Sequence, residues 1–150
     1  MPQSLAKNLI HLIFSTKRRE PLLIDPVRPA LHAYLTTVFK NIQSPVLIIN
    51  SVEDHVHVLF ALQRTIALAV VVEEIKKSSS KWLKTQSPDL ASFSWQAGYG
   101  AFSVSESNVA TVKHYIANQA EHHRKVSFQD ELRRFLVKHN INFNERYLWD

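Results

Sequence analysis

Two histidines separated by one residue are the first feature of this sequence that could do chemistry. They are His55 and His57, in the segment HVHVLFAL, whose β-branched and aromatic residues are typical of a strand. Side chains alternate between the two faces of a strand, so both imidazoles emerge on one face, about 6.5–7 Å apart at the backbone. Such a pair can hold one metal ion. The same pattern also suits two polar residues on the solvated face of a half-exposed strand.

A tyrosine and an amide form the second feature, in the segment HYIANQAEHH. Tyr115 and Gln119 are four residues apart and therefore lie on one side of a helix. We expect His122 on the same side, as a possible partner of the site, and His123 in solvent. The expected core stripe of this helix is Val109, Val112, Ile116 and Ala120.

Together these side chains predict phosphoryl-transfer chemistry. A tyrosine phenolate is a competent nucleophile toward phosphorus, although the phenol has a pKa of about 10. A nearby divalent cation can polarise a phosphate oxygen and neutralise the charge that develops on it. Two imidazoles and the amide oxygen of Gln119 form a neutral ligand set with open positions. This set suits Mg²⁺ or Mn²⁺ better than a closed structural zinc site.

The elements that must position these residues follow the order β-α-β-β-α-β, with further helices after them. This order predicts an α+β, ferredoxin-like (split βαβ) fold: an antiparallel sheet with helices packed on it and the tyrosine-bearing helix near the C-terminus. No linker or repeat divides the 150 residues, so we expect a single catalytic domain over 1–150. Strands are predicted at 8–16, 45–52, 55–62 and near 100–104, and helices at 26–42, 67–85, 106 to about 124, and from Ser127 onward.

Composition and charge narrow the classes of protein. The chain has no cysteine, which excludes a disulfide scaffold and any cysteine-ligated zinc site. The N-terminal apolar stretch is short and interrupted by His11, so neither a signal peptide nor a membrane span is expected. We therefore expect a cytoplasmic protein, nucleoid-associated when bound to DNA. The net charge of +5 suits a nucleic-acid partner, and equally a mildly basic enzyme.

Basic and aromatic residues outside the two motifs are candidates for DNA contact. A basic turn follows the first strand, a lysine-rich face runs along the second helix, and one tyrosine lies between the only two glycines. Such residues can contact phosphates or stack on unpaired bases. His11 lies on the first strand, where it is a candidate hydrogen-bond partner of a metal ligand, a phosphate contact or a packed core-edge residue. The predicted DNA contacts are Lys17, Arg18, Arg19, Lys76 and Tyr99.

The order of these motifs resembles the single-tyrosine HUH transposases of the insertion-sequence type and the related REP-associated tyrosine transposases. The segments HLIFSTKRREPLL, VEDHVHVLFAL, IKKSSSKWLK, WQAGYGAFSVS and YIANQAEHH carry the resemblance over nearly the whole chain. It implies His55, His57 and Gln119 as metal ligands and Tyr115 as the nucleophile. The implied reaction cleaves single-stranded DNA through a 5′-phosphotyrosine and then transfers the strand.

The resemblance also implies partners. It predicts a hairpin-forming single-stranded DNA and a homodimer in which the tyrosine helix of one subunit completes the site of the other, without a nucleotide cofactor. Ser51 and Lys77 stand where such proteins often have glycine, which affects DNA contacts rather than the chemistry.

Two other functions fit parts of the pattern. The first is a domesticated, non-transposing protein that binds single-stranded DNA hairpins, although a pure binder needs no metal ligands. The second is a zinc hydrolase, which would require a carboxylate on the histidine face of the strand. Asp54 is the only nearby acid in the sequence. Alternation along the strand would turn it away from His55, unless the turn in which Asp54 sits breaks the alternation.

Overall fold

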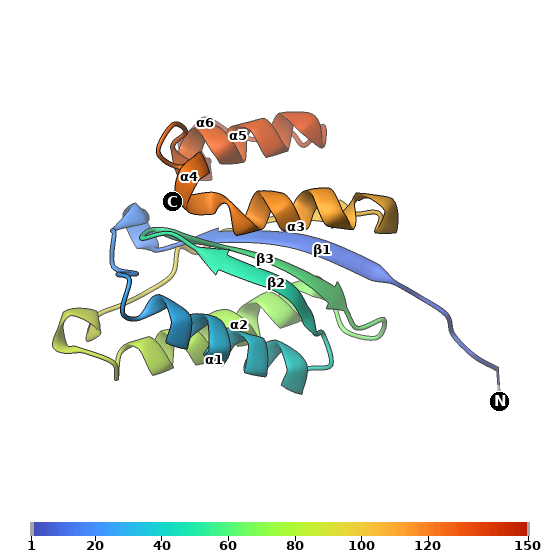
Figure 1. Ribbon diagram of the computed structural model, residues 1–150, viewed down its shortest axis with the longest axis horizontal. Helices are drawn as coiled ribbons and strands as arrows, with labels where there is room; N and C mark the ends of the chain where they lie inside the picture. The colour runs from blue at the N-terminus through green and yellow to red at the C-terminus, as the bar shows by residue number, and fades with distance from the viewer. Residues whose placement is uncertain (1, 150) are drawn as a thin grey trace.

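A four-stranded antiparallel sheet organises the computed structural model, which describes residues 2–149. The strand order is β2-β3-β1-β4, so β3 and β1 are central. Helices α1 and α2 cover one face, and α3, α4 and α5 cover the other (Figure 1). The strands are β1 (Asn8–Ser15), β2 (Val46–Ser51), β3 (His55–Leu62) and β4 (Gly100–Val104). The helices are α1 (Arg28–Asn41), α2 (Leu68–Leu83), α3 (Val109–Ala117), α4 (Gln119–His122), α5 (Phe128–Lys138) and α6 (Glu145–Leu148), with 3₁₀ turns η1 (Lys17–Arg19), η2 (Pro88–Leu90) and η3 (Glu106–Asn108).

The predicted α+β, ferredoxin-like order is confirmed. The bounds of β3 and β4 agree with the prediction, and those of β1, β2, α1 and α2 differ by one or two residues. Among the described residues, no helix is both long and apolar enough to cross a bilayer.

The main apolar core lies between the sheet and the pair α1 and α2. Every second residue of β1 and β3 points into it, as the pleat of a strand requires. These side chains are fully or almost fully buried against the two helices. From the strands they are Leu12, Phe14, Val56, Val58 and Phe60.

The opposite face of the sheet carries two smaller apolar clusters. One lies under α3 and consists of Leu9, Leu59 and Ile116. The other lies under α5 and consists of Ile13, Phe102, Phe128, Leu132 and Leu136. His11, His55 and His57 belong to this face as well, and all three are buried. The histidines of the sheet therefore lie between two apolar clusters, one packed under α3 and one packed under α5.

The third predicted helix is not continuous, because the chain departs from helical geometry at Asn118. This residue has φ −102° and ψ 26°, and its side-chain amide donates to the carbonyl of His114 at 2.7 Å. Asparagine competes with the helical ladder through such bonds. The break leaves Ala120 exposed, where we expected core, and turns Gln119 and His123 toward the sheet.

Helix α5 begins where the sequence predicted. Ser127 is its N-cap and accepts a hydrogen bond from the backbone N–H of Asp130 at 3.2 Å, a common way to satisfy a free donor at a helix start. Phe128 and Leu132 then dock the helix on the sheet. This docking aims Glu131 inward, where it is only 1% exposed.

Candidate active site

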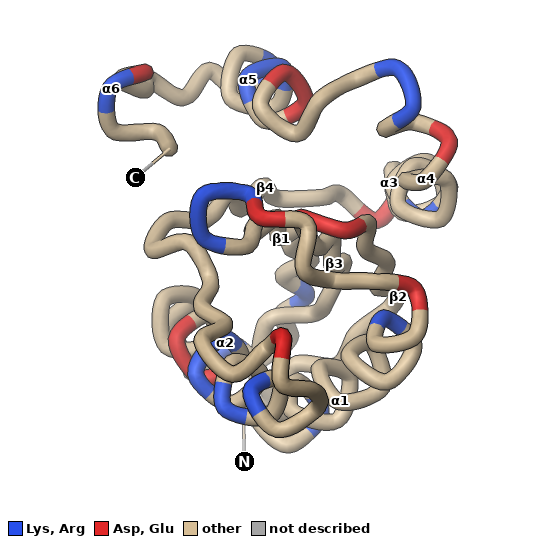
Figure 2. Tube along the Cα trace, turned by 90° about the vertical axis from the view of Figure 1, so that its left-hand side faces the viewer, with Lys and Arg blue, Asp and Glu red and all other residues tan. Residues whose placement is uncertain are grey.

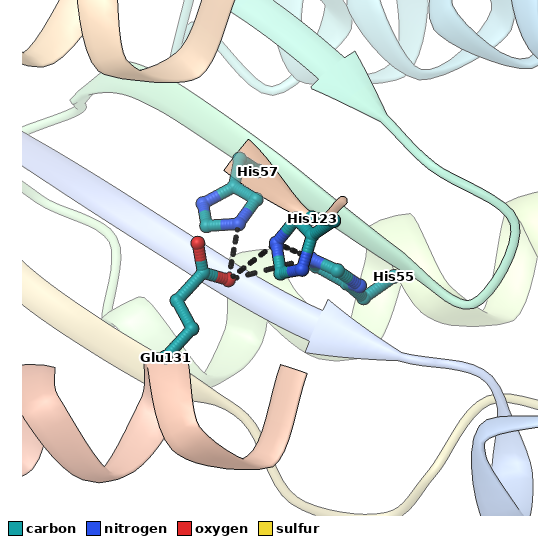
Figure 3. A group of neighbouring side chains, drawn as sticks. All are labelled: His55, His57, His123 and Glu131. Atoms are coloured by element: carbon teal, nitrogen blue, oxygen red, sulfur yellow. Dashed lines mark hydrogen bonds and ion pairs between the residues drawn. The ribbon is translucent and has the colours of Figure 1, made fainter. Parts of the chain in front are cut away.

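Three imidazoles and one carboxylate converge on the α3–α5 face of the sheet (Figure 3). His55 and His57 come from β3, His123 follows α4, and Glu131 comes from α5. One ligand atom from each residue lies within 4.8 Å of the others. Both strand histidines therefore share one face, as the alternation predicted, and the group as a whole could hold a metal ion.

The carboxylate of Glu131 lies at the centre of this group. Its Oε1 atom is 2.9 Å from Nε2 of His57, 3.3 Å from Nε2 of His55 and 3.1 Å from Nε2 of His123. The Nε2 atoms of His55 and His123 are 3.0 Å apart. All three imidazoles thus present the same ring nitrogen to one small volume.

The other ring nitrogen of each imidazole, Nδ1, has a hydrogen-bond partner of its own. Such a second partner fixes the ring orientation of metal-binding histidines and increases their basicity. The partners of Nδ1 are Asp54 Oδ1 for His55 at 2.6 Å, His11 Nε2 for His57 at 2.8 Å, and the carbonyl oxygen of Val126 for His123 at 2.7 Å.

Tyr115 reaches the same cluster from α3 of the same chain. Its hydroxyl donates a hydrogen bond to Oε2 of Glu131 and lies 3.3 Å from Nε2 of His122. Its ring centroid is 5.8 Å from that of His57. The side-chain amide of Asn50, on β2, holds the end of this helix by donating to the carbonyl of Ile116 at 2.9 Å. A single chain therefore brings the tyrosine to its own histidines.

Gln119 is fully buried one turn beyond Tyr115. Its Nε2 donates to the carbonyl of Tyr115 at 3.3 Å, whereas its Oε1 has no hydrogen-bond partner among the described residues. A buried polar atom without a partner costs about 1–3 kcal/mol. An unpaired carbonyl oxygen of this kind is the donor that a divalent cation would use, so the residue fits the predicted ligand role.

The electrostatics of the cluster are dominated by one buried negative charge. Burial raises the pKa of Glu131, but the stronger combined effect of the three histidines lowers it, so the carboxylate is ionised. Burial and this charge together raise the pKa of Tyr115. Burial lowers the pKa of His57 to about 4. The pKa of His55 is raised because its bonds to Asp54 and Glu131 outweigh the opposing effect of burial.

A groove of about 250 Å³ gives access to Tyr115 between α3 and α5. Tyr115, His122 and Glu131 line it, together with the basic residues Arg134 and Lys138 of α5. Both basic residues are exposed. The predicted DNA contacts did not include these two side chains, because their relevance depends on where α5 docks.

The predicted basic turn lies at the end of β1 as η1. Figure 2 shows it beside the sheet, below the C-terminal segment that carries α6. Lys17 and Arg18 are exposed, and both Arg18 and Arg19 have φ of 57°, a strained conformation for these residue types. The guanidinium of Arg19 lies 5.5 Å above the ring of Trp149.

The other two predicted DNA contacts lie beside each other. The ammonium of Lys76 donates to the carbonyls of Gln96 and Gly98, each at 2.8 Å, and is 5.6 Å from the ring of Tyr99. Burial lowers the pKa of Lys76 to about 8. This lysine thus holds the 96–98 loop, whereas Tyr99 stays 42% exposed and free to stack.

The structure overturns one expectation about the site, resolves a second and adds a residue. His123 was expected in solvent, but the break at Asn118 places it in the cluster. For Asp54 the sequence left two orientations open, and the turn before β3 lets it bind Nδ1 of His55. Glu131 was not predicted as a site residue. Its position three residues after Phe128 and one before Leu132, on the apolar stripe of α5, was the available signal.

Comparison with known proteins gives one family and two similar structures. The family model described as "Transposase IS200 like" matches residues 4–119. A protein assigned as a transposase in Deinococcus radiodurans R1 is 24% identical, with a TM-score of 0.62 over 79% of this chain and 98% of that chain. A REP-associated tyrosine transposase bound to a REP hairpin is 15% identical, with a TM-score of 0.61 over 84% of this chain and 74% of that chain. These two likenesses concern the fold, and no curated protein matches the chain.

Proposed function

Because this chain belongs to the IS200-like transposase family, we propose that it is a metal-dependent single-tyrosine transposase that cleaves and rejoins single-stranded DNA. Tyr115 is the nucleophile, and His55, His57 and Gln119 are metal ligands. One observation carries the proposal: the Tyr115 hydroxyl lies in the same buried cluster as both strand histidines, bonded to the carboxylate that contacts them. Family membership supports the transposase activity, and this geometry supports the tyrosine chemistry.

The proposed cleavage exchanges one phosphodiester bond for another. The oxygen of Tyr115 forms a bond to phosphorus while the bond from phosphorus to the 3′ oxygen breaks. The fragment on the 3′ side of the break remains on the enzyme through its 5′ phosphate, as a phosphotyrosine. The other fragment leaves with its 3′ oxygen as a hydroxyl after that oxygen takes up a proton. Strand transfer is the reverse reaction with a different 3′ hydroxyl.

His122 is the proposed acceptor of the tyrosine proton. Its Nε2 lies 3.3 Å from the hydroxyl of Tyr115, and burial lowers its pKa, which favours the neutral ring that can accept a proton. Glu131 also contacts the hydroxyl, but its lowered pKa makes it a weak base. The protonated His122 can then return the proton to the departing 3′ oxygen.

The residues present fit a divalent ion, for which Mg²⁺ and Mn²⁺ are the expected choices. The Nε2 atoms of His55 and His57 both face the cluster, and the Gln119 carbonyl oxygen is buried without a partner. When bound, such an ion would polarise a phosphate oxygen and offset the negative charge that resists ionisation of Tyr115.

The groove between α3 and α5 is the proposed path of the DNA strand. Arg134 and Lys138 line it beside Tyr115 and would contact phosphates flanking the cleaved bond. The exposed Lys17 and Arg18 form a second basic contact, and Tyr99 a stacking platform. One structural relative is bound to a REP hairpin, which supports a hairpin-forming strand as the substrate class here.

We propose a homodimer in which the tyrosine and the histidines of each active site come from the same chain. The sequence resemblance implied that each tyrosine helix completes the partner's site. Here α3 packs on the sheet of its own chain, and Asn50 holds its end. We therefore propose that each chain cleaves DNA with its own tyrosine.

Detection of a covalent protein–DNA adduct on a denaturing gel tests the proposal. Wild type, Tyr115→Phe and a matched control, Tyr147→Phe, would be incubated with Mn²⁺ and single-stranded hairpin oligonucleotides from the flanks of the gene. Tyr147 is 61% exposed on α6. Adducts in wild type and Tyr147→Phe alone are the expected result. An adduct in Tyr115→Phe contradicts the nucleophile assignment, and hairpin binding without any adduct favours the non-transposing DNA-binding alternative.

A further inference from the structure

We propose that the segment after Gln119 completes the metal centre, with Glu131 as an anionic ligand and His123 as a third imidazole ligand. This inference rests on the proposed function in one respect, that the cluster holds a divalent ion. The family match ends at residue 119, so both residues lie beyond the region that the family defines. The centre would then join three histidines, one carboxylate and the carbonyl oxygen of Gln119.

The separations between the Glu131 carboxylate and the three imidazoles are those of adjacent ligands around one ion. Ligands about 2.1 Å from an ion lie about 3.0 Å apart when adjacent in an octahedron and about 3.4 Å apart in a tetrahedron. Oε1 of Glu131 is 2.9–3.3 Å from the Nε2 atoms of His55, His57 and His123. The Glu131 oxygen therefore lies at ligand-to-ligand distance from all three imidazoles, and the whole group lies within 4.8 Å, close enough to contract around one ion.

The orientation of His123 points to the same role. Its Nδ1 lies 2.7 Å from the carbonyl oxygen of Val126, which can only accept, so Nδ1 carries a proton. In the neutral ring, Nε2 then presents a lone pair toward Oε1 of Glu131. A cation satisfies lone pairs that face one another in this way.

The charge of Glu131 supports a cationic partner as well. The carboxylate is 1% exposed, and its ion-pair partners among residues 2–149 are all histidines. Burying a carboxylate is costly unless it is paired or coordinates a metal. The helix that carries it is fixed by the Ser127 cap and by Phe128 and Leu132 on the sheet. The contacts that dock α5 on the sheet therefore offset the free-energy cost of burying this charge in the cluster.

The ligand set predicts which ions bind. Imidazoles favour transition-metal ions, whereas Mg²⁺ prefers oxygen ligands and several waters. We therefore expect Mn²⁺ and Zn²⁺ to bind well above Mg²⁺ in affinity. Glu131 would also couple the ion to the nucleophile, because its second oxygen accepts the hydrogen bond from Tyr115.

Isothermal titration with Mn²⁺ in the absence of DNA tests the proposal. The variants are Glu131→Gln, His123→Gln and a control, Glu121→Gln, whose carboxylate is 63% exposed and pairs with Arg124. We expect Glu131→Gln and His123→Gln each to weaken Mn²⁺ binding at least about 10–100-fold, the loss typical for disturbed metal sites. Glu121→Gln should bind as wild type does.

The alternative is that Glu131 merely fills the site as an internal counter-ion. Its removal would then leave Mn²⁺ affinity unchanged or increase it, and either result overturns the proposal. Circular dichroism of each variant checks folding. If Glu131→Gln does not fold, His123→Gln carries the test alone, and unchanged Mn²⁺ affinity in that variant overturns the proposal. A wild type that binds no Mn²⁺ refutes the metal-dependent function itself, which is a distinct outcome.

Discussion

The two faces of strand β3 differ in chemistry although both are buried. Val56, Val58 and Phe60 point to α1 and α2 and join a continuous apolar core. His55 and His57 point to α3 and α5 and are equally inaccessible to solvent. The comparison shows that burial alone does not define the core of this protein. One face contributes stability by packing, and the other places polar groups where water is scarce.

The two faces also differ in what holds them together. The apolar face needs only shape and volume, since burying a large aliphatic or aromatic side chain contributes about 1.5–3 kcal/mol without directional partners. On the histidine face every buried polar atom needs a partner in the right direction. Those partners come from Asp54, His11 and Glu131, which lie on three different elements.

Removing a tyrosine hydroxyl from each face of the sheet should produce the largest difference in DNA-adduct formation. Tyr115→Phe is expected to abolish the covalent DNA adduct while leaving the fold intact, because only the hydroxyl is lost. A residue on the opposite face, Tyr34, is the matched control: its hydroxyl donates to the carbonyl of Ser78 at 3.2 Å. Tyr34→Phe should form adducts as wild type does, and a denaturing gel compares the two. Loss of adducts in both variants would mean that the faces are not functionally separate.

Replacement of the strand histidines should have the next largest effect. His55→Ala and His57→Ala each remove a proposed ligand, so metal-dependent cleavage should fall by several orders of magnitude, as should cleavage by wild type in a chelator. The measurement is cleavage of a labelled hairpin oligonucleotide with and without Mn²⁺. Full activity of wild type in chelator would disprove the role given to the ion.

A cavity on the apolar face should change stability rather than chemistry. Leu12 is fully buried in the main core, and Leu12→Ala should lower the free energy of unfolding by about 2–5 kcal/mol. Urea unfolding monitored by circular dichroism gives this value. The folded fraction should still form the DNA adduct, and a variant that is stable but inactive would show that the two faces are coupled.

The smallest expected effect is on DNA binding, when a lysine is removed from a helix on either side of the sheet. Lys138 lines the groove beside Tyr115, so Lys138→Ala should weaken hairpin binding modestly and reduce the salt dependence by about one ion. Lys81 is exposed on α2, on the other side of the sheet, and Lys81→Ala is the matched control. Fluorescence anisotropy across a salt series measures the hairpin affinity of both variants. Equal losses of affinity would indicate that DNA contacts both sides of the molecule.

Much of the architecture followed from local patterns. The β-branched and aromatic residues of HVHVLFAL predicted β3. Alternation along it predicted the shared face of its two histidines, because strand geometry repeats every two residues. The same kind of rule placed the start of α5 at Ser127. Across the break at Asn118, the side-chain amide of Gln119 still donates to the carbonyl of Tyr115.

The composition of the cluster depended on tertiary structure. His123 was assigned to solvent because helical periodicity was continued through Asn118, where a side-chain bond to the His114 carbonyl competes with the helix. Glu131 enters the site only because Phe128 and Leu132 dock α5 against the sheet. Periodicity in the sequence therefore determined which residues share a face within one element. The packing of elements far apart in the chain decided which faces meet, because burial and hydrogen bonding between them have no local signature.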